Sequence, residues 1–157
     1  MKCHSLLIFF YIYRINETNL QEVWRTANLI GDVQLMRACV PTLVSHYAVN
    51  PIDPRLLEAS EMGGLKCLLS DERSQWLSVL SRVLAIAGWV KAAPAVESQK
   101  HRINAFTDLV TLIDFNATTP LDCVGLLCDD DFAALPSSCK CVPRSLLIYC
   151  ESITSQH

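Results

Sequence analysis

The chain has 157 residues, the size of one ordinary domain. Hydrophobic residues make up 51% of it and charged residues 18%, a composition that excludes an intrinsically disordered chain. The formal net charge is −3 and no long run of Lys or Arg occurs, so we expect neither a nucleic acid nor a membrane as partner. The five glycines form neither GxGxxG nor GxxxxGK, which excludes a glycine-rich phosphate loop.

Residues 1–15 form a separate N-terminal segment. Its apolar run, Leu6–Tyr13 (LLIFFYIY), is too short to cross a bilayer as a helix. A signal-peptide core is one interpretation, but no small-residue cleavage site follows the run. The β-branched and aromatic residues favour a buried strand instead. We therefore expect a remnant or a frayed segment that could include one short strand.

From residue 16 onwards, apolar residues recur every three or four positions, which predicts helices joined by short turns. Thr18 and Gln21 fit a capping box at the start of the first helix. Gly31 should end this helix, and Asp32 should cap the next one. The expected buried stripe of the first helix is Leu20, Val23, Trp24, Ala27 and Ile30.

The second helix contains a proline, Pro41. An interior proline loses a hydrogen bond, so we expect either a kink or an end near Cys39 and a restart. The apolar stripe of this helix is Val33, Met36, Val40, Leu43 and Val44.

Two short helices should follow. Asp53 and Pro54 form a cap and a first turn, which predicts a helix through Met62 that Gly63-Gly64 stops. Leu65–Ser70 predicts the next one. The longest helix should then run from Ser74 to Val90. Its expected stripe is Trp76, Leu80, Val83, Leu84, Ala87 and Val90.

The last part of the chain starts with a polar loop at 92–100 that contains Pro94. Three further helices are expected, the second of which opens at Thr119-Pro120. Their stripes are Ile103, Phe106, Leu109, Val110 and Ile113, then Leu121, Val124 and Leu127, then Val142, Leu146, Leu147, Tyr149 and Cys150. The sequence thus predicts an all-α domain of stacked antiparallel helical hairpins at 16–151, followed by a tail at 152–157.

The cysteines are the residues with the most chemical potential. We interpret them as reduced, buried thiols of an intracellular protein, with the cytoplasm favoured over the nucleus. The alternative is a zinc site at Cys123, Cys128, Cys139 and Cys141, but the gaps CxxxxC and CxC differ from the usual CxxC. We expect no metal and no cofactor. The remaining cysteines are Cys3, Cys39, Cys67 and Cys150.

No pattern of catalytic residues is found, so we expect no enzyme. A cysteine nucleophile needs a nearby histidine, and no glycine-rich elbow accompanies any cysteine. The three consecutive acids Asp129–Asp131 lack EF-hand spacing and are interpreted as a solvated loop or a helix cap. We expect Trp24, Trp76 and Trp89 in the core, with Trp24 as an interface anchor being the alternative. The histidines are His4, His46, His101 and His157.

Five stretches of the chain follow one another in an order that we compare with known families. They are NLQEVWRTANLIGDVQLMRACVPTLVSHY (19–47), GLKCLLSD (64–71), AIAGWV (85–90), RINAFTDLVTLIDF (102–115) and SCKCVPRSLLIY (138–149). Together they resemble the BACK domain, which lies between the BTB/POZ domain and the Kelch repeats of Kelch-like adaptor proteins. One departure is Asp114, which stands where arginine is commoner.

The resemblance implies a protein-interaction module of a substrate adaptor for a cullin-type ubiquitin ligase, with a cullin-type scaffold as protein partner. The family's BTB domain dimerises and grips the cullin, its first BACK helices add to that contact, and its Kelch propeller binds substrate. Residues 1–15 are too few for a BTB domain, so we expect a fragment, an alternative product or an incomplete gene model. The alternative function is a structural or cytoskeletal scaffold without a ligase link. The oligomeric state is not predicted.

Overall fold

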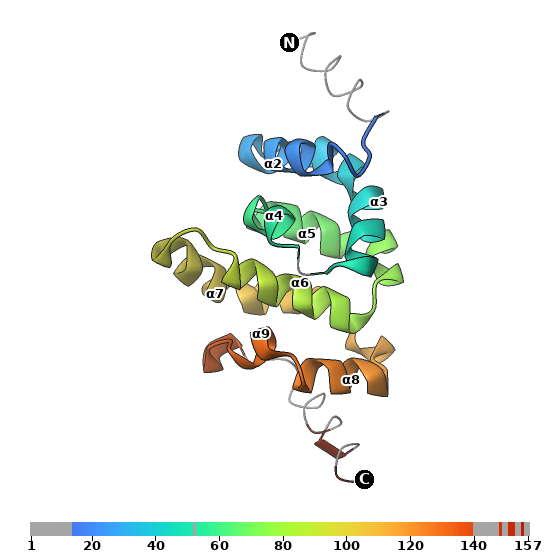
Figure 1. Cartoon of the computed structure of the whole chain (residues 1–157), viewed down its shortest axis with the longest axis vertical. Helices are drawn as coiled ribbons and strands as arrows, with labels where there is room; N and C mark the ends of the chain where they lie inside the picture. The colour runs from blue at the N-terminus through green and yellow to red at the C-terminus, as the bar shows by residue number, and fades with distance from the viewer. Residues whose placement is uncertain (1–13, 52, 140–147, 149–150, 153–154, 156–157) are drawn as a thin grey trace.

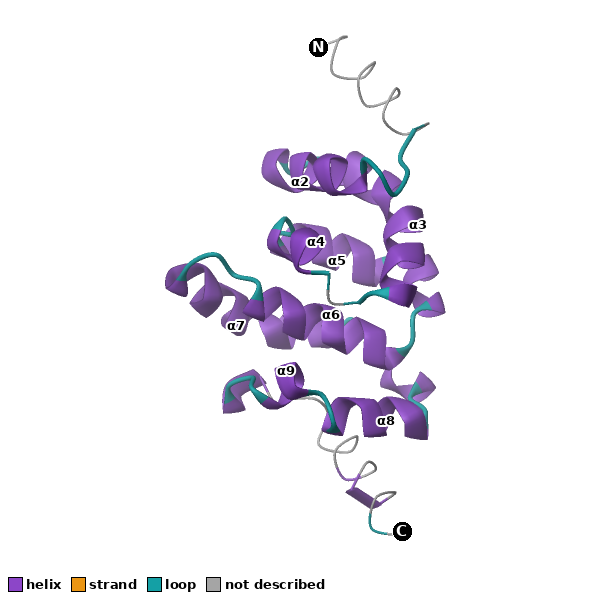
Figure 2. Cartoon of the chain, in the orientation of Figure 1, coloured by secondary structure: helices purple, strands orange, loops and turns teal. Residues whose placement is uncertain are grey.

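The computed structural model describes residues 14–51, 53–139, 148, 151–152 and 155. The described residues form helices and turns and no strand, so the all-α prediction is confirmed (Figure 2). The short strand expected before residue 15 and most of the last expected helix lie outside the described residues. The helices are α2 (Leu20–Ile30), α3 (Val33–Val49), α4 (Pro54–Glu58), α5 (Met62–Ser70), η1 (Glu72–Trp76), α6 (Val79–Lys91), α7 (Val96–Val110), η2 (Phe115–Ala117), α8 (Pro120–Leu127), α9 (Asp130–Ala133) and η3 (Ser137–Cys139).

The helices form an elongated stack of layers (Figure 1). Helix α2 lies at one end and α8 with α9 at the other, with α4, α5, α6 and α7 between them. Consecutive helices α2 and α3 pack on each other, as do α6 and α7. Helix α5 contacts both α3 and α7, and α6 contacts both α8 and α9. Each inner layer is therefore covered on two sides, which is why its apolar residues are buried.

The first two helices meet at a tight turn that the sequence predicts correctly. Gly31 ends α2 in the left-handed conformation, with φ 68°. The Asp32 carboxylate caps α3 by accepting a hydrogen bond from the Leu35 backbone N–H at 3.0 Å. The expected cap at Thr18 is wrong, because Asn19 precedes α2 and the Asn16 side chain accepts the Thr18 N–H instead.

Helix α3 runs through Pro41 without an end at Cys39, so the expectation of an end and a restart is wrong. Pro41 cannot donate to the carbonyl of Arg37 one turn earlier. Burial outweighs that loss, because apolar side chains on both sides of the proline enter one core. They are Leu35, Met36, Cys39, Val40, Leu43, Val44 and Tyr47.

The boundary between α4 and α5 differs from the sequence prediction. Asp53 caps α4 as expected, but α4 already ends at Glu58. Gly63 and Gly64 do not stop a helix, because both lie inside α5. At Gly64, an added Cβ would lie 2.1 Å from the Asn28 Oδ1 atom of α2. The glycine is therefore a point of close approach between two helices rather than a break.

Helix α6 begins later than the sequence predicts. Ser78 caps it by accepting the Ser81 N–H at 3.0 Å, and the residues before it form the separate 3₁₀ helix η1. Trp76 falls in η1 and is 81% exposed, so its expected place in the core is wrong. Because α6 has only 13 residues, α3 with 17 residues is the longer helix. The loop predicted at 92–100 is shorter as well, since α7 begins at Val96.

The helix start predicted at Thr119-Pro120 is correct, and the structure shows in addition that Thr119 forms a capping box with Asp122. However, the expected apolar stripe of α8 faces outward, since Leu121, Val124 and Leu127 are exposed. The side of α8 that packs on α6 is the one with Gly125, which lies so close to Leu80 that an added Cβ would be 2.5 Å from a Leu80 methyl group. The inward residues are Asp122, Cys123 and Leu126.

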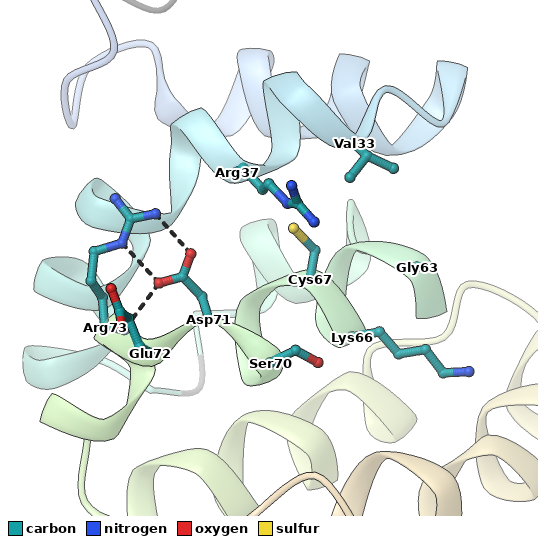
Figure 3. Close-up of a pocket in the computed structure, with 9 residues that line it drawn as sticks. All are labelled: Val33, Arg37, Gly63, Lys66, Cys67, Ser70, Asp71, Glu72 and Arg73. Carbon is teal, nitrogen blue, oxygen red and sulfur yellow. Dashed lines mark hydrogen bonds and ion pairs between the residues drawn. The ribbon is translucent and has the colours of Figure 1, made fainter.

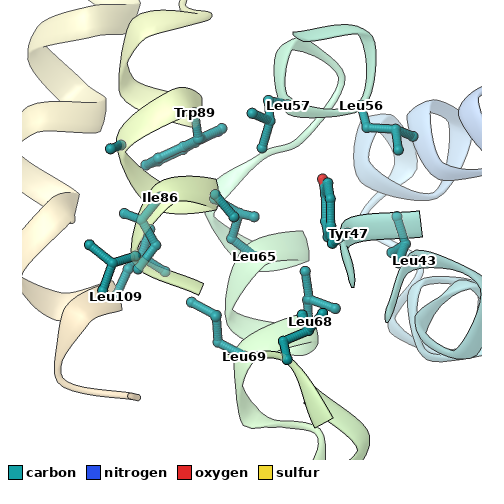
Figure 4. Close-up of a cluster of buried hydrophobic side chains, with 14 of the residues drawn as sticks. Leu43, Tyr47, Leu56, Leu57, Leu65, Leu68, Leu69, Ile86, Trp89 and Leu109 are labelled. Atoms are coloured by element: carbon teal, nitrogen blue, oxygen red, sulfur yellow. The ribbon is translucent and has the colours of Figure 1, made fainter. Parts of the chain in front are cut away.

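The core runs through the middle of the stack (Figure 4). Tyr47 of α3 lies between the α4 leucines and α5, and Trp89 of α6 lies toward Leu57. Burial of this many apolar side chains is the main stabilising term of the fold. The labelled members are Leu43, Tyr47, Leu56, Leu57, Leu65, Leu68, Leu69, Ile86, Trp89 and Leu109.

A fully buried polar residue, Ser60, joins three layers of the stack. It lies in the short link between α4 and α5. Its hydroxyl accepts the Trp24 indole N–H of α2 at 2.7 Å and donates to the Leu56 carbonyl at 2.7 Å. Its backbone carbonyl accepts the Trp89 indole N–H of α6 at 2.8 Å. The indole N–H groups, which are the only polar side-chain groups of Trp24 and Trp89, thereby both find an acceptor at one residue.

Arg102 of α7 binds the same link and is itself buried. Its guanidinium donates to the Trp89 carbonyl at 2.6 Å and, over longer distances, to the carbonyls of Leu57, Glu58 and Ser60. It also lies 4.9 Å from the Trp89 ring centroid. Burial lowers the pKa of Arg102, with Glu61 and Glu58 opposing the shift. The cation thus interacts with the carbonyl ends of α4 and α6, where the helix dipoles favour positive charge.

Ser60→Ala should lower the free energy of unfolding by about 1–3 kcal/mol, because the Trp24 indole N–H keeps its burial and loses its acceptor. Urea unfolding followed by circular dichroism measures the change. The matched control is Ser45→Ala on the exposed side of α3, expected within about 0.5 kcal/mol of the wild type. An equal effect of the two substitutions would contradict the role of the Ser60 hydroxyl.

Pro41→Ala should raise the free energy of unfolding by about 1–3 kcal/mol, because alanine restores the missing N–H of an unbroken helix. Pro41 is exposed, so little packing is lost. Pro120→Ala is the control: at the first position of α8 an N–H has no acceptor within the helix, and we expect a loss below about 1 kcal/mol. A destabilised Pro41→Ala variant would show that α3 needs its proline.

Candidate interaction surface

A groove of about 670 Å³ runs between α3 on one side and α5 with η1 on the other (Figure 3). Most of the residues that line it are polar or charged, and its floor is the exposed side of α5. The basic side chains Arg37 and Lys66 come from the two facing helices. The lining residues are Val33, Arg37, Gly63, Lys66, Cys67, Ser70, Asp71, Glu72 and Arg73.

One end of the groove is fixed by an ion pair between Asp71 and Arg73. The Arg73 guanidinium donates to the two carboxylate oxygens at 2.8 and 2.7 Å, and the Asp71 carboxylate also accepts the Arg73 backbone N–H. These hydrogen bonds, with the charge of Arg73, hold the pKa of Asp71 below its usual range although partial burial opposes the shift. Asp71 therefore caps η1 and keeps Arg73 at the groove wall.

Cys67 lies half-buried in the groove with its sulfur toward Arg37 (Figure 3). Burial raises the pKa of the thiol, although the hydrogen bond and the positive charge of Arg37 act in the opposite direction. A thiol with a raised pKa is protonated at neutral pH and is a weak nucleophile. Burial therefore acts against activation of the Cys67 thiol as a nucleophile.

An exposed apolar side chain lies at one end of the groove. Val33 lines one end, and Ile30 and Leu29 precede it across the α2–α3 turn; the three are 50%, 51% and 83% exposed. Trp76 is 81% exposed and follows Arg73, a lining residue near the other end, by three residues in η1.

The cysteines of the alternative zinc site do not form a metal-binding cluster in the part of the chain that the structure describes. Cys123 and Cys139 are buried and Cys128 is exposed, while Cys141 lies outside the described residues. Within the described ranges, no group of three or more His, Cys, Asp or Glu side chains is placed to hold a metal ion. The interpretation as buried thiols holds for Cys39, Cys123 and Cys139 and is wrong for Cys128.

The other polar residues that the sequence singles out have structural contacts. His46 closes α3 and bonds the Asp53 carboxylate through Nε2 at 2.9 Å. Asp129 caps α9 by accepting the Phe132 N–H, and Asp131 forms an ion pair with Lys91 of α6. The interpretation of the acidic run as a helix cap is therefore confirmed for Asp129. His101 is exposed, and His4 and His157 lie outside the described residues.

The groove has no signature in the sequence. Its residues have no common motif, and they meet only because α3 packs on α5. The exposure of Trp76, by contrast, had a local signal, since the cap at Ser78 separates Trp76 from α6 and so removes it from the buried face.

Comparison with protein-family models, with curated protein sequences and with solved structures finds no match for this chain. None of the helices in the described residues combines the length and the apolar content that a membrane crossing requires.

The three tryptophans should differ in accessibility, because Trp24 and Trp89 are buried and Trp76 is exposed. In the native protein, acrylamide should quench only one component of the fluorescence, with emission typical of an indole in water. Trp76→Phe should remove this component and leave the shielded emission. Denatured protein, in which all three become accessible, is the control, and a quenchable component that survives Trp76→Phe would contradict the exposure of Trp76.

Proposed function

We propose that this chain is a non-catalytic protein-interaction module of a substrate adaptor for a cullin-type ubiquitin ligase. The main support is the way in which three of the BACK-like stretches meet at one residue. Trp24 from the first stretch, Trp89 from the third and Arg102 from the fourth all donate hydrogen bonds to Ser60. Residues far apart in sequence that share one buried junction belong to one structural unit, as the resemblance implies.

The surface of the stack supports the interaction role. Leu29 and Ile30 at the end of α2 are exposed aliphatic residues on a turn that Gly31 and Asp32 hold rigidly. Exposed apolar residues that lie together on a rigid scaffold are typical of protein-binding surfaces. In the proposed adaptor this corner of α2 and α3 contributes to the cullin contact.

The proposal predicts that the chain captures a cullin-type scaffold protein in a pull-down, more weakly than a fusion that carries a BTB domain ahead of residue 16. Leu29→Asp with Ile30→Asp should reduce capture by about tenfold or more, because a buried interface position does not accept an unpaired carboxylate. Val96→Asp on α7 changes an equally exposed aliphatic residue away from the corner and should have no effect.

If the BTB fusion captures the cullin-type protein and the chain alone does not, the module is limited to the role of a spacer. Failure of both would reject the ligase role. Recovery of cytoskeletal proteins in their place would then favour the scaffold alternative.

A further inference from the structure

Helix α8, which lies at one end of the stack, has an apolar outer face (Figure 1). Leu121, Val124 and Leu127 are 77%, 41% and 42% exposed, and Cys128 directly after the helix is exposed as well. The one charged residue of α8, Asp122, is buried on the inner side. In stacked helical proteins the end layers need a polar outer face to stay soluble. The outer face of α8, defined by these four apolar residues, has the opposite polarity and therefore requires a cover.

The size of this face disfavours a second copy of the chain as the cover. Helix α8 has 8 residues, so it is about 12 Å long and, with side chains, about 10 Å wide. A standard protein–protein interface covers about 800 Å² on each partner. The outer face of α8 is much smaller than that, and it suits one helix of similar length.

The sequence predicts a helix of that length shortly after the end layer. Residues 142–150 lie outside the described structure except for Ile148, and their apolar residues recur at helical spacing. As a helix this segment would be about 14 Å long, close to the length of α8. Its apolar stripe is Val142, Leu146, Leu147, Tyr149 and Cys150.

The described residues in this part of the chain agree with such a contact. Ile148, Glu151 and Ser152 are helical and exposed. At about 100° per residue, position 148 lies about 200° from positions 146 and 150, opposite the apolar stripe. The exposed Ile148 therefore marks the outer side of the predicted helix, and the stripe on its other side is the part that would contact α8.

The connection also fits. Cys139 of η3 is buried, and the three steps from there to position 142 span up to about 10 Å. Because α9 and η3 follow the C-terminal end of α8, the segment would start at that end and run antiparallel to α8. Lys140 and Arg144 would then come near Asp130 and the carbonyl end of α8, where positive charge is favoured.

We propose that residues 142–150 form a helix that packs antiparallel on the outer face of α8 and closes this end of the stack. The exposed leucines of α8 thereby belong to a contact within the chain rather than to a surface for a partner protein. The inference does not depend on the proposed ligase role, since neither the α2–α3 corner nor a cullin takes part in it.

Cys150 reports on this contact, because it lies on the apolar stripe and its reaction rate depends on its exposure. Brief labelling of the native full-length chain with a maleimide, followed by peptide mass analysis, gives the rate at each cysteine. We expect Cys150 to react at least about tenfold more slowly than in the urea-unfolded chain, since a contact worth about 1.4 kcal/mol shields it to that extent.

Leu121→Asp should raise the labelling rate of Cys150 about tenfold, because an antiparallel segment ends beside the start of α8 and a carboxylate is not accepted in that contact. The variant should fold, since Leu121 is 77% exposed and aspartate suits the first turn of a helix. Leu146→Asp changes the segment instead of the described stack and should have the same effect. Ile148→Asp, on the outer side of the same segment, is the matched control and should stay within about twofold.

Three results would overturn the inference: native Cys150 that reacts as fast as in the unfolded chain, an unchanged rate in both Leu121→Asp and Leu146→Asp, or an equal rise in Ile148→Asp. Circular dichroism of each variant checks that the helices of the stack are intact. Protection of Cys150 that is lost on dilution, together with a dimer in sedimentation, would also overturn it, because a second copy would then cover α8.

Discussion

The fold depends on a polar junction inside an apolar stack. Ser60 accepts hydrogen bonds from Trp24, Trp89 and Arg102, so one residue of a short link satisfies groups from three helices. Buried donors of this kind cost stability when unpaired and fix a single arrangement when paired. Apolar contacts alone are not directional, whereas the hydrogen bonds to Ser60 require both indoles and the guanidinium to reach one residue. The junction thereby determines how α2, α6 and α7 are placed around the α4–α5 link.

That placement also shapes the surface. Asn28 of α2 accepts the Glu61 N–H at the start of α5 and donates to the Trp24 carbonyl, so α2 and α5 lie in close contact beside Gly64. Helix α5 therefore has one side against the stack and presents Cys67 toward Arg37 of α3, while the exposed Lys66 extends away from α3 (Figure 3). The groove is a consequence of the same contacts that hold the layers together. A rigid floor of this kind favours selective binding because little conformational freedom is lost when a partner docks.

The sequence predicts those parts of the structure that depend on local chemistry. The Gly31 turn and the caps at Asp32, Asp53 and Thr119 are correct because each is decided by residues within one helical turn. The all-α class is correct for the described residues because apolar residues recur at helical spacing from residue 16 onwards. These features need no knowledge of which helix is the neighbour.

The wrong predictions concern features that depend on a residue far away in the sequence. Gly64 is helical because Asn28 of another helix approaches it, and α8 turns its apolar stripe outward because Gly125 packs on Leu80. The groove also forms between helices that meet only in the folded chain, so no single stretch of sequence predicts it. The error at Trp76 has a different cause. Its spacing from the apolar residues of α6 is that of a buried residue on the same helix, but Trp76 belongs to the separate 3₁₀ helix η1 ahead of α6.

The position of Arg102 has a consequence for how this domain can be divided. In many helical repeat proteins each layer contacts only its neighbours, and repeats can be removed one by one. Here the guanidinium of α7 reaches across α6 to the carbonyls that end α4. A chain cut after Lys91 would leave those carbonyls and the Trp89 carbonyl without their shared donor. The layers from α2 to α7 should consequently behave as one indivisible cooperative unit, from which no shorter independent repeat can be excised.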